Sequence, residues 1–401
     1  MGFEITVITR KWERPIKVYA DECYPTTPET KIEKSANTKI IYTPYLGNIR
    51  DKLYAKYGEN KFVLLRRLLS AVNLLTRNLH PIFSPYKTLY DAAKMEIENN
   101  KPDVILITAN PFNQFLFGYL LKKRFNIPWI ADYRDDWTTS ELKVFSSVLD
   151  RFIIAQHRKY EKRWVETASY ISSVSSYYVE KITKLTKVPG FVLQNGFNPE
   201  LQKKATPVHF DGTFRILHNG TLYNTQRFEI YIDAIKTVID RIGNQVKIEL
   251  LFPGVAIDPN QVNRIKIASG EYFKYFKISN RIPQEELMNM QQKANMVLMV
   301  AHTGLKGIPS SKLYEYIALR KKILVCPSDG DIIEQIVSEC EVGYIANDAA
   351  KAAELIIKEI EICLKTQKTD LAGNSERIEK YSSSHQANIL AERIDSLRCI
   401  G

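Results

Sequence analysis

The sequence predicts an α/β protein with two domains, each built on a doubly wound parallel sheet covered by helices. Three observations support this fold class. Segments with the apolar pattern of strands alternate with segments of helical period over nearly all of the 401 residues. With 45% apolar residues, a chain of this length can bury two separate cores. The polar stretch 200–212 fits neither pattern, and it divides the alternation into two halves.

The first half alternates short apolar runs with longer amphipathic segments. The runs predict strands near 5–9, 39–43, 104–108, 129–132, 170–174 and 191–193. The longer segments predict helices near 62–79, 87–99, 112–124, 145–167 and 176–186. Residues 10–60 otherwise show little pattern, and the charged, threonine-rich stretch 20–38 is expected to be a surface loop.

The second half follows a turn at 195–199 and repeats the same alternation. It predicts strands near 214–217, 247–252, 275–278, 296–301, 322–326 and 343–346. The last helix, near 387–398, is expected to fold back on the first domain. The predicted domains are therefore residues 1–198, joined by 380–401, and residues 199–379.

The segment 62–79 differs from the other predicted helices. Its polar residues Arg66, Ser70, Asn73 and Arg77 recur at helical spacing and form a narrow stripe, while apolar residues fill nearly all the other positions. Two interpretations follow. Either the helix is buried on most sides, or it lies in the interface of an anionic membrane with its arginines at the headgroups.

A second distinctive segment, 306–326, has the pattern of a loop, a helix start and a buried strand. Lys312 lies where the helix begins, after an N-cap at Ser310 or Ser311. A cation there opposes the helix dipole at a cost of roughly 0.3–1 kcal/mol, unless an anion binds between it and the free backbone N–H groups. One turn further on, Glu315 could accept hydrogen bonds from vicinal hydroxyls. The pattern indicates a phosphate and ribose site, or else an ordinary surface helix with a solvated lysine and glutamate.

Residues 213–240 repeat this arrangement. An apolar strand leads into the loop 218–223 and then into a helix that begins near Gln226, so the start of the helix points back to the loop. Gly220 lets a ligand approach the backbone, and Arg227 provides a second cation at a helix start. We therefore expect two cations, from separate parts of the second half, to converge on one anionic ligand.

The composition of the chain indicates which kinds of partner and which cellular compartment to expect. The chain has 56 Lys+Arg against 45 Asp+Glu, a net charge of +11, which favours an anionic partner. Nucleic acid is not expected, because the basic residues are spread along the chain and no nucleic-acid module is recognisable. The 5 cysteines show no metal-ligand spacing and fit a reducing cytosol. With no signal-peptide pattern and no apolar window long enough to span a bilayer, we expect a cytoplasmic protein, either soluble or peripheral at the inner face of the membrane.

Four segments, in order along the chain, match a known pattern. They are Asp-Tyr-Arg-Asp-Asp-Trp at 132–137, Asn-Gly-Phe-Asn at 195–198, His-Asn-Gly-Thr-Leu-Tyr at 218–223 with Arg227, and Lys-Leu-Tyr-Glu-Tyr at 312–316. Together they resemble family 4 glycosyltransferases. The resemblance implies the GT-B fold, in which two Rossmann-like doubly wound domains face each other across a cleft. It also implies a retaining glycosyltransferase that moves a sugar from a nucleotide-sugar donor on the second domain to an acceptor on the first.

The resemblance also implies roles for individual residues. Arg227 and Lys312 would be the catalytic cations at the pyrophosphate, and Asp135 and Asn110 would lie on the acceptor side. The acceptor would be a polysaccharide, a glycolipid or a lipid-linked glycan in cell-surface glycan synthesis. Neither a cofactor nor a metal is expected, because two fixed cations can stabilise the departing diphosphate. The donor-binding residues would be Asn219, Gly220, Thr221, Ser311, Lys312, Leu313 and Glu315.

Other polar residues near these segments have simpler interpretations. Asp132, Asp135 and Asp136 could form an acidic metal site, but their spacing is not Asp-x-Asp and an arginine lies among them. A role in the wall of the cleft fits better, with Asp132 only ending a strand. His218 and His302 flank the expected donor site, and a lone histidine near a strand end is more often structural.

The sequence departs from the family pattern in two places. Gly307 occupies the position, eight residues before Glu315, at which many relatives have a first glutamate that holds sugar hydroxyls. The strand at 5–9 resembles the family's second strand, so the first strand and its glycine-rich loop would be missing and neighbouring strand edges would be unpaired. Two other functions therefore stay open: a sugar-nucleotide epimerase on the same fold, and a degenerate transferase that serves as a non-catalytic scaffold.

Overall fold

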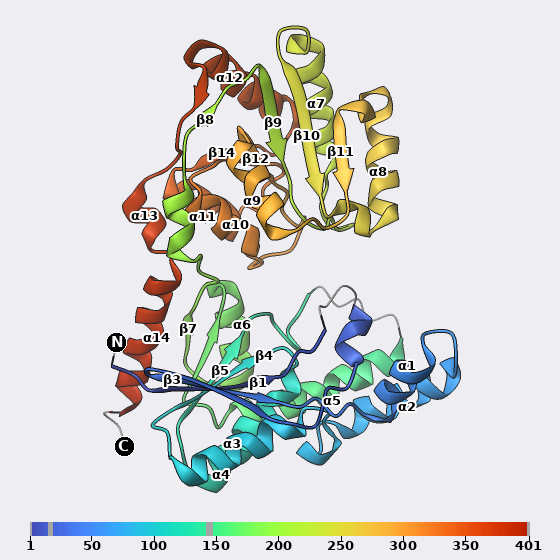
Figure 1. The fold of residues 1–401 in the computed structure, drawn as a ribbon, viewed down its shortest axis with the longest axis vertical. Coiled ribbons are helices and arrows are strands. Elements are labelled where there is room, and N and C mark those ends of the chain that lie inside the picture. The colour runs from blue at the N-terminus through green and yellow to red at the C-terminus, as the bar shows by residue number, and fades with distance from the viewer. Residues whose placement is uncertain (1, 15–18, 142–146, 399–401) are drawn as a thin grey trace. The chain divides into compact units, whose positions relative to one another are not determined.

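The computed structural model describes residues 2–14, 19–141 and 147–398, and the chain forms two compact units (Figure 1). Unit 1 contains Met1–Ser173, Val179–Phe191 and Ile394–Gly401, and unit 2 contains Val174–Tyr178 and Val192–Arg393. The main crossing from unit 1 to unit 2 thus falls at residue 192, a few residues before the predicted turn.

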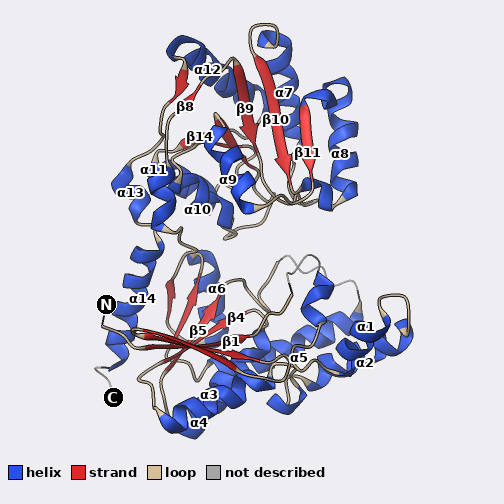
Figure 2. Ribbon diagram, viewed as in Figure 1, coloured by secondary structure: helices blue, strands red, loops and turns tan. Residues whose placement is uncertain are grey.

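The strands of unit 1 form two sheets (Figure 2). The first sheet has the order β1-β3-β2, with β1 parallel to β3 and β2 antiparallel to it. Its strands are β1 (Ile5–Arg10), β2 (Lys31–Ser35) and β3 (Thr38–Thr43). The second sheet has the order β4-β5-β6-β7. Its strands are β4 (Ile105–Ala109), β5 (Trp129–Tyr133), β6 (Tyr170–Ser173) and β7 (Gly190–Val192).

The end strands β1 and β4 of these two sheets expose apolar side chains. Among the described residues, β1 and β4 each end their sheet, and no strand pairs with the outer edge of either. Ile5 and Val7 of β1 and Leu106 of β4 are exposed apolar residues at these edges. Because every open sheet has two end strands, the absence of the family's first strand stays a prediction.

Helices join the strands of unit 1. Those before β4 are α1 (Ile49–Tyr57), α2 (Val63–Thr76) and α3 (Lys87–Asn99), and those after it are α4 (Phe115–Phe125), α5 (Val148–Val165) and α6 (Ser176–Thr186). Among them, α3 and α4 contact strands of the two sheets. The core includes the fully buried Trp129, Phe115 and Trp164. A Cβ atom at Gly118 would lie 2.6 Å from the Trp129 ring, so a glycine lets α4 lie directly on β5.

Two features of unit 1 correct the sequence predictions. The stretch 20–38 was expected to be a loop, but it contains β2, whose five residues are all exposed. A strand without a buried face has no apolar alternation, so the pattern could not reveal it. No residue of α2 is buried, so the interpretation of that helix as packed on most sides is wrong.

Unit 2 contains a parallel six-stranded sheet with the order β11-β10-β9-β12-β13-β14. The strands on one side are β9 (Thr213–Leu217), β10 (Lys247–Pro253) and β11 (Phe276–Ser279), and those on the other are β12 (Met296–Met299), β13 (Lys322–Val325) and β14 (Gly343–Ile345). A short antiparallel pair, β8 (Val208–His209) with β15 (Lys368–Thr369), lies apart from this sheet. All six predicted strands of this half are present within about two residues of their predicted ends.

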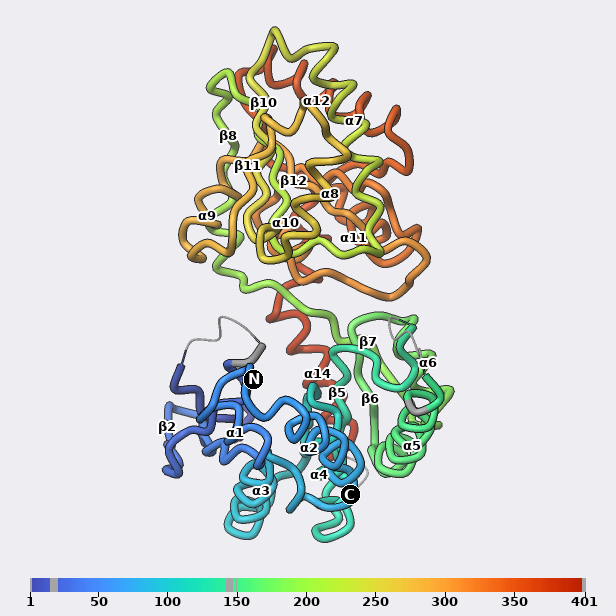
Figure 3. The backbone as a smooth tube through the Cα atoms, turned by 90° about the vertical axis from the view of Figure 1, so that its right-hand side faces the viewer, coloured from blue at the N-terminus to red at the C-terminus, as the bar shows by residue number. Residues whose placement is uncertain are grey.

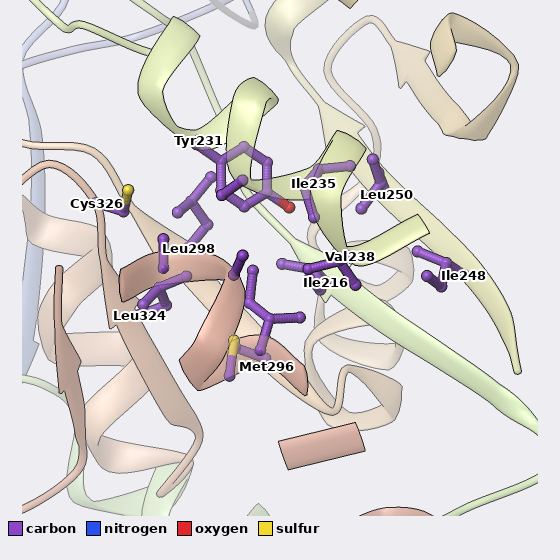
Figure 4. Packing of buried hydrophobic residues seen from close by; sticks show 14 of the residues in the cluster. Ile216, Tyr231, Ile235, Val238, Ile248, Leu250, Met296, Leu298, Leu324 and Cys326 are labelled. Carbon is purple, nitrogen blue, oxygen red and sulfur yellow. The ribbon is translucent and has the colours of Figure 1, made fainter. Parts of the chain in front are cut away.

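Helices cover both faces of the unit 2 sheet. They are α7 (Glu229–Ile242), α8 (Pro259–Ser269), α9 (Gln284–Lys293), α10 (Ser311–Ala318), α11 (Ile332–Cys340), α12 (Ala349–Thr366) and α13 (Ser375–Glu379). Of these, α7 and α12 lie side by side on one face (Figures 1 and 3). Figure 4 shows Tyr231 and Val238 of α7 packed over Ile216 and Leu298 of the sheet. The next strand residue, Leu217, belongs to the core of the opposite face, because successive strand side chains alternate.

The last helix, α14 (Ser383–Arg398), begins in unit 2 and ends in unit 1. In unit 1, Nε of Arg398 lies 3.3 Å from Oδ2 of Asp103, and the hydroxyls of Tyr170 and Ser396 lie 3.5 Å apart. The end of α14 therefore groups with unit 1. No helix within the described residues has the length and apolar character needed to cross a membrane.

Candidate functional site

The carboxyl ends of β9 and β12 meet where the strand order of the unit 2 sheet reverses. From β9 the chain adds β10 and β11 on one side, and it then returns to add β12, β13 and β14 on the other. In open parallel sheets, ligands bind outside the carboxyl ends of the strands at such a switch point. The loop 218–228 follows β9 and the loop 300–310 follows β12, so both predicted donor-site segments begin here.

The side chain of Lys312 lies against the backbone of Gly220. A Cβ atom at Gly220 would lie 2.6 Å from Nζ of Lys312. Gly220 also has a φ of +92°, a left-handed conformation that favours glycine, and its N–H donates to the carbonyl of Pro253 at 2.7 Å. Two features therefore favour glycine at this position: the left-handed backbone conformation, and the lack of space for a Cβ atom beside Lys312.

Lys312 is a partly buried cation that forms no ion pair with any carboxylate in the described part of the chain. It lies in the first turn of α10, whose N-cap Ser310 makes no side-chain cap hydrogen bond. Burial lowers the pKa of Lys312 to about 8, and the carboxylate of Glu315 opposes this shift only in part. No carboxylate of the described residues lies within 4.0 Å of the ammonium. An anion bound between this lysine and the start of α10 would compensate both the lysine and the helix dipole.

Two histidines lie within the field of Lys312. Nδ1 of His218 lies 3.2 Å from the carbonyl of Leu298, so this nitrogen has the proton and donates it. Nε2 of His218 has no hydrogen-bond partner in the described part of the chain. Burial, and then the charge of Lys312, lower the pKa of His218 to about 3 and also lower that of His302. Both rings are therefore uncharged above neutral pH.

Neighbouring side chains hold Glu315 and Asn219 in place. Oε2 of Glu315 accepts a hydrogen bond from Nε2 of the buried Gln291 at 3.1 Å. The hydroxyl of Tyr316 donates to Oδ1 of Asn219, and the N–H of Asn219 donates to that hydroxyl at 3.4 Å. The loop after β9 is thereby fixed to α10, which places Asn219, Gly220, Lys312 and Glu315 in one neighbourhood.

Contacts that the sequence analysis did not predict connect the two loops. Nε2 of Gln226 donates to the carbonyl of Val300 at 2.5 Å, and the hydroxyl of Thr225 lies 2.7 Å from Nδ1 of His302. The N–H of Thr303 donates to the carbonyl of Thr225 at 2.8 Å. These are polar residues in loops without a motif, so their position after a strand was the only signal in the sequence.

Arg227 lies on the turn before α7, and its side chain is exposed. The pKa of Glu229 is lowered chiefly by its hydrogen bonds from Arg264, and Arg227 adds a smaller effect. The convergence of Arg227 and Lys312 on one diphosphate stays a prediction.

The remaining donor-side residues lie in different environments. Leu313 is fully buried and its N–H donates to the N-cap carbonyl of α10 at 3.0 Å, whereas Ser311 is exposed and Thr221 is partly buried. Gly307 lies where the resemblance to family 4 predicts a glutamate. It has a φ of +73°, and its N–H donates to Oδ2 of Asp331 at 2.5 Å. A glutamate in this left-handed conformation would be strained.

The predicted acceptor-side residues lie at one edge of a unit 1 sheet. Asn110 follows β4 and Asp135 follows β5, and Ala109 pairs with Tyr133 in these neighbouring parallel strands. Both side chains are exposed. Partial desolvation, and then the charge of Asp136, raise the pKa of Asp135.

The other two aspartates of this segment already have partners. Asp132, fully buried in β5, accepts hydrogen bonds from the hydroxyl of Ser172 at 2.8 Å and from Nε of Arg134 at 3.0 Å. Asp136 forms an ion pair with Lys181 at 3.4 Å. Within the described residues, no group of three or more His, Cys, Asp or Glu could hold a metal ion. These contacts give both carboxylates a structural role.

Comparisons with known proteins identify the fold. No protein-family model matches the chain, and no curated protein sequence matches it significantly. Sucrose-phosphate synthase from Thermosynechococcus elongatus is similar in structure, with a TM-score of 0.59 and 14% identity over 100% of this chain and 90% of that one. A UDP-forming α,α-trehalose-phosphate synthase from Burkholderia xenovorans gives a TM-score of 0.61 and 12% identity over 98% and 99%.

A third similar structure contains ligands. Anabaena HepE in complex with UDP and glucose gives a TM-score of 0.53 and 14% identity, over 77% of this chain and 81% of that one. At such low identities the similarity shows the fold alone, and that fold is GT-B, with its two Rossmann-like units. Membership of family 4 stays a prediction.

Proposed function

We propose that this protein is a retaining glycosyltransferase that moves a sugar from a nucleotide-sugar, bound by unit 2, to an acceptor bound by unit 1. The observation that supports this best is the uncompensated ammonium of Lys312 against the backbone of Gly220, at the switch point of a Rossmann-like sheet. A diphosphate supplies the anion that this arrangement lacks. Glu315, one helical turn further on, is suited to accept hydrogen bonds from ribose hydroxyls.

The chemistry of the transfer explains why a cation is needed. The bond between the anomeric carbon and the donor phosphate oxygen breaks, and a bond from the same carbon to the acceptor hydroxyl oxygen forms while that hydroxyl loses its proton. The nucleoside diphosphate leaves with additional negative charge. Lys312 and Arg227 would stabilise that charge more strongly in the transition state than in the ground state.

The structural neighbours support the type of donor. One of them is named as a UDP-forming synthase, and HepE was crystallised with UDP and glucose. We take a UDP-sugar as the first donor to test. Retention of anomeric configuration and the roles of Asn110 and Asp135 on the acceptor side come from the resemblance to family 4.

We also propose that the acceptor is a polysaccharide, a glycolipid or a lipid-linked glycan, and that the enzyme acts in cell-surface glycan synthesis at the cytoplasmic face of the membrane. Support for a membrane location comes from the exposed apolar side of α2. Support for a reducing compartment comes from Cys23, Cys326, Cys340 and Cys363, which are buried and unpaired.

A panel of labelled nucleotide-sugars, incubated with a membrane-lipid and glycan extract as acceptor, tests the function. We expect transfer of label together with release of nucleoside diphosphate, and we expect Lys312→Ala and Glu315→Ala to abolish both. The exposed Lys293 of α9 provides a matched control, Lys293→Ala, that should leave turnover unchanged. Full activity in both site variants would refute the donor site.

The same experiment separates the alternative functions. An epimerase would convert the sugar without releasing nucleoside diphosphate. A non-catalytic scaffold would show no turnover, and a thermal-shift screen over the same panel would show no binding.

A further inference from the structure

The helix α2 presents apolar side chains to solvent. Its most exposed residues are Leu64, Leu68 and Leu75, with 80%, 62% and 55% of their surface accessible. These positions lie one and three turns apart on the same side of the helix. Leu65 and Val72 flank them and are exposed as well.

The polar stripe of α2 faces the protein. Nε of Arg66 donates to the carbonyl of Lys61 at 3.2 Å, and Nη2 of Arg66 donates to the carbonyl of Glu59. The guanidinium of Arg66 lies 5.4 Å from the ring centroid of Tyr54 in α1, and the hydroxyl of Ser70 donates to the carbonyl of Arg66 at 2.8 Å. The helix is thus turned the opposite way from an ordinary surface helix, whose apolar side faces the core.

The exposed apolar surface continues beyond both ends of α2. Phe62 precedes the helix in edge-to-face contact with Tyr57 of α1, at 5.0 Å between ring centroids, and Ile82 and Phe83 follow it. We call residues 62–83 the α2 patch; α1 and α2 lie on the right of Figure 1. Soluble monomers rarely expose contiguous apolar surface of this extent unless a partner covers it.

The charge around the patch indicates which partner that is. The segment 60–90 contains no Asp or Glu, and its basic residues are Lys61, Arg66, Arg67, Arg77 and Lys87. A second copy of the chain would bring the same positive charge to the patch, whereas an anionic lipid surface complements it. With 14 residues, α2 is about 21 Å long, which is short of the roughly 30 Å hydrocarbon core but suited to lie along the interface.

We propose that the α2 patch docks unit 1 onto an anionic lipid bilayer. The apolar side of α2 lies at the boundary of the acyl chains, and Lys61 and Arg67, which are both exposed, contact the lipid phosphates. Arg66 keeps its contacts within the protein, so the expectation that all the arginines of this helix reach the headgroups is corrected. The proposal uses residues of unit 1 alone, and it holds whether or not the protein transfers sugar.

Co-sedimentation of the full chain with lipid vesicles tests the proposal. We expect binding to vesicles that contain phosphatidylglycerol, weaker binding to pure phosphatidylcholine, and weaker binding as salt is raised. Leu68→Glu should reduce the partition coefficient about tenfold or more, and Leu64→Gln provides a second variant that adds no charge. Ile267→Glu in α8 is the matched control, because Ile267 is 74% exposed and lies outside the patch; it should bind as the unchanged protein does.

Three results would overturn the proposal. The first is no binding to anionic vesicles at low ionic strength. The second is equal binding by the unchanged protein and both patch variants. The third is a stable dimer in solution, measured by light scattering, that Leu68→Glu dissociates, because a second copy would then cover the patch.

Discussion

The affinity of the protein for UDP is expected to fall as the pH rises through 8. Burial lowers the pKa of Lys312 from 10.5 to about 8 in the free protein. A bound diphosphate favours the charged lysine and returns its pKa toward the ordinary value. Binding therefore takes up a proton above pH 8, so the full affinity is present below that pH and is lost above it.

The size of the loss in UDP affinity follows from the lowered pKa of Lys312. When the free lysine has a pKa of about 8 and the bound lysine stays protonated, affinity drops about tenfold, or about 1.4 kcal/mol, between pH 7 and pH 9. The neighbouring histidines do not contribute over this range, because the pKa values of His218 and His302 are both lowered from 6.5. The second pKa of a terminal phosphate is about 6, so UDP is already almost fully charged at pH 7 and adds little to the pH dependence over this range.

Isothermal titration calorimetry with UDP at pH 7, 8 and 9, in buffers of different ionisation enthalpy, measures both the affinity and the proton uptake. Lys312→Arg is the informative variant, because arginine stays charged throughout this range. We expect the pH dependence to disappear in that variant, whatever its absolute affinity. A pH-independent affinity in the unchanged protein, or an undiminished dependence in Lys312→Arg, would refute the assignment of Lys312 to the diphosphate.

Three further predictions concern the same site. Gly220→Ala should weaken UDP binding at least about tenfold, because the added Cβ would lie 2.6 Å from Nζ of Lys312. Gly212→Ala is the control, because Gly212 also has a positive φ, +84°, but has open space around it. This control should lower the free energy of unfolding by about 1–2 kcal/mol and leave the UDP affinity unchanged. Glu315→Ala should remove most of the preference for UDP over its 2′-deoxy analogue in competition titrations, and a ratio that does not change would exclude Glu315 from the ribose site. Tyr316→Phe removes the hydroxyl that holds the loop after β9, so denaturant unfolding should show a loss of about 1 kcal/mol, and no measurable loss would contradict this account.

Much of the candidate site could be predicted because its signals are local. The start of α10 at Ser311, with Ser310 as the N-cap residue, follows from a short run of residues read in order. Gly220 was identifiable because a glycine after a buried strand marks a close approach of the backbone. The loop contacts of Gln226 and Thr225 were not predictable, since each depends on a residue more than 70 positions away.

The helix α2 shows where periodicity stops being informative. Its spacing revealed an apolar side and a polar stripe, but it could not show which of the two faces the protein. The structure shows that the stripe with Arg66 and Ser70 faces inward. The guanidinium of Arg66 donates hydrogen bonds to backbone carbonyls and lies over the ring of Tyr54. Because the polar stripe faces the protein, the apolar side of α2 is the exposed surface whose membrane binding can be tested.

By itself, the sequence determined the order and approximate limits of most strands, of most helices in the first half and of the last helix, and the placement of Lys312 at a helix start. These depend on apolar periodicity and capping, which act over a few neighbouring residues. Only the tertiary structure decided that the ammonium of Lys312 lies on the backbone of Gly220, and that the strand at Lys31–Ser35 exists although none of its residues is buried. Both depend on which distant segments pack together, and that is a property of the whole folded chain.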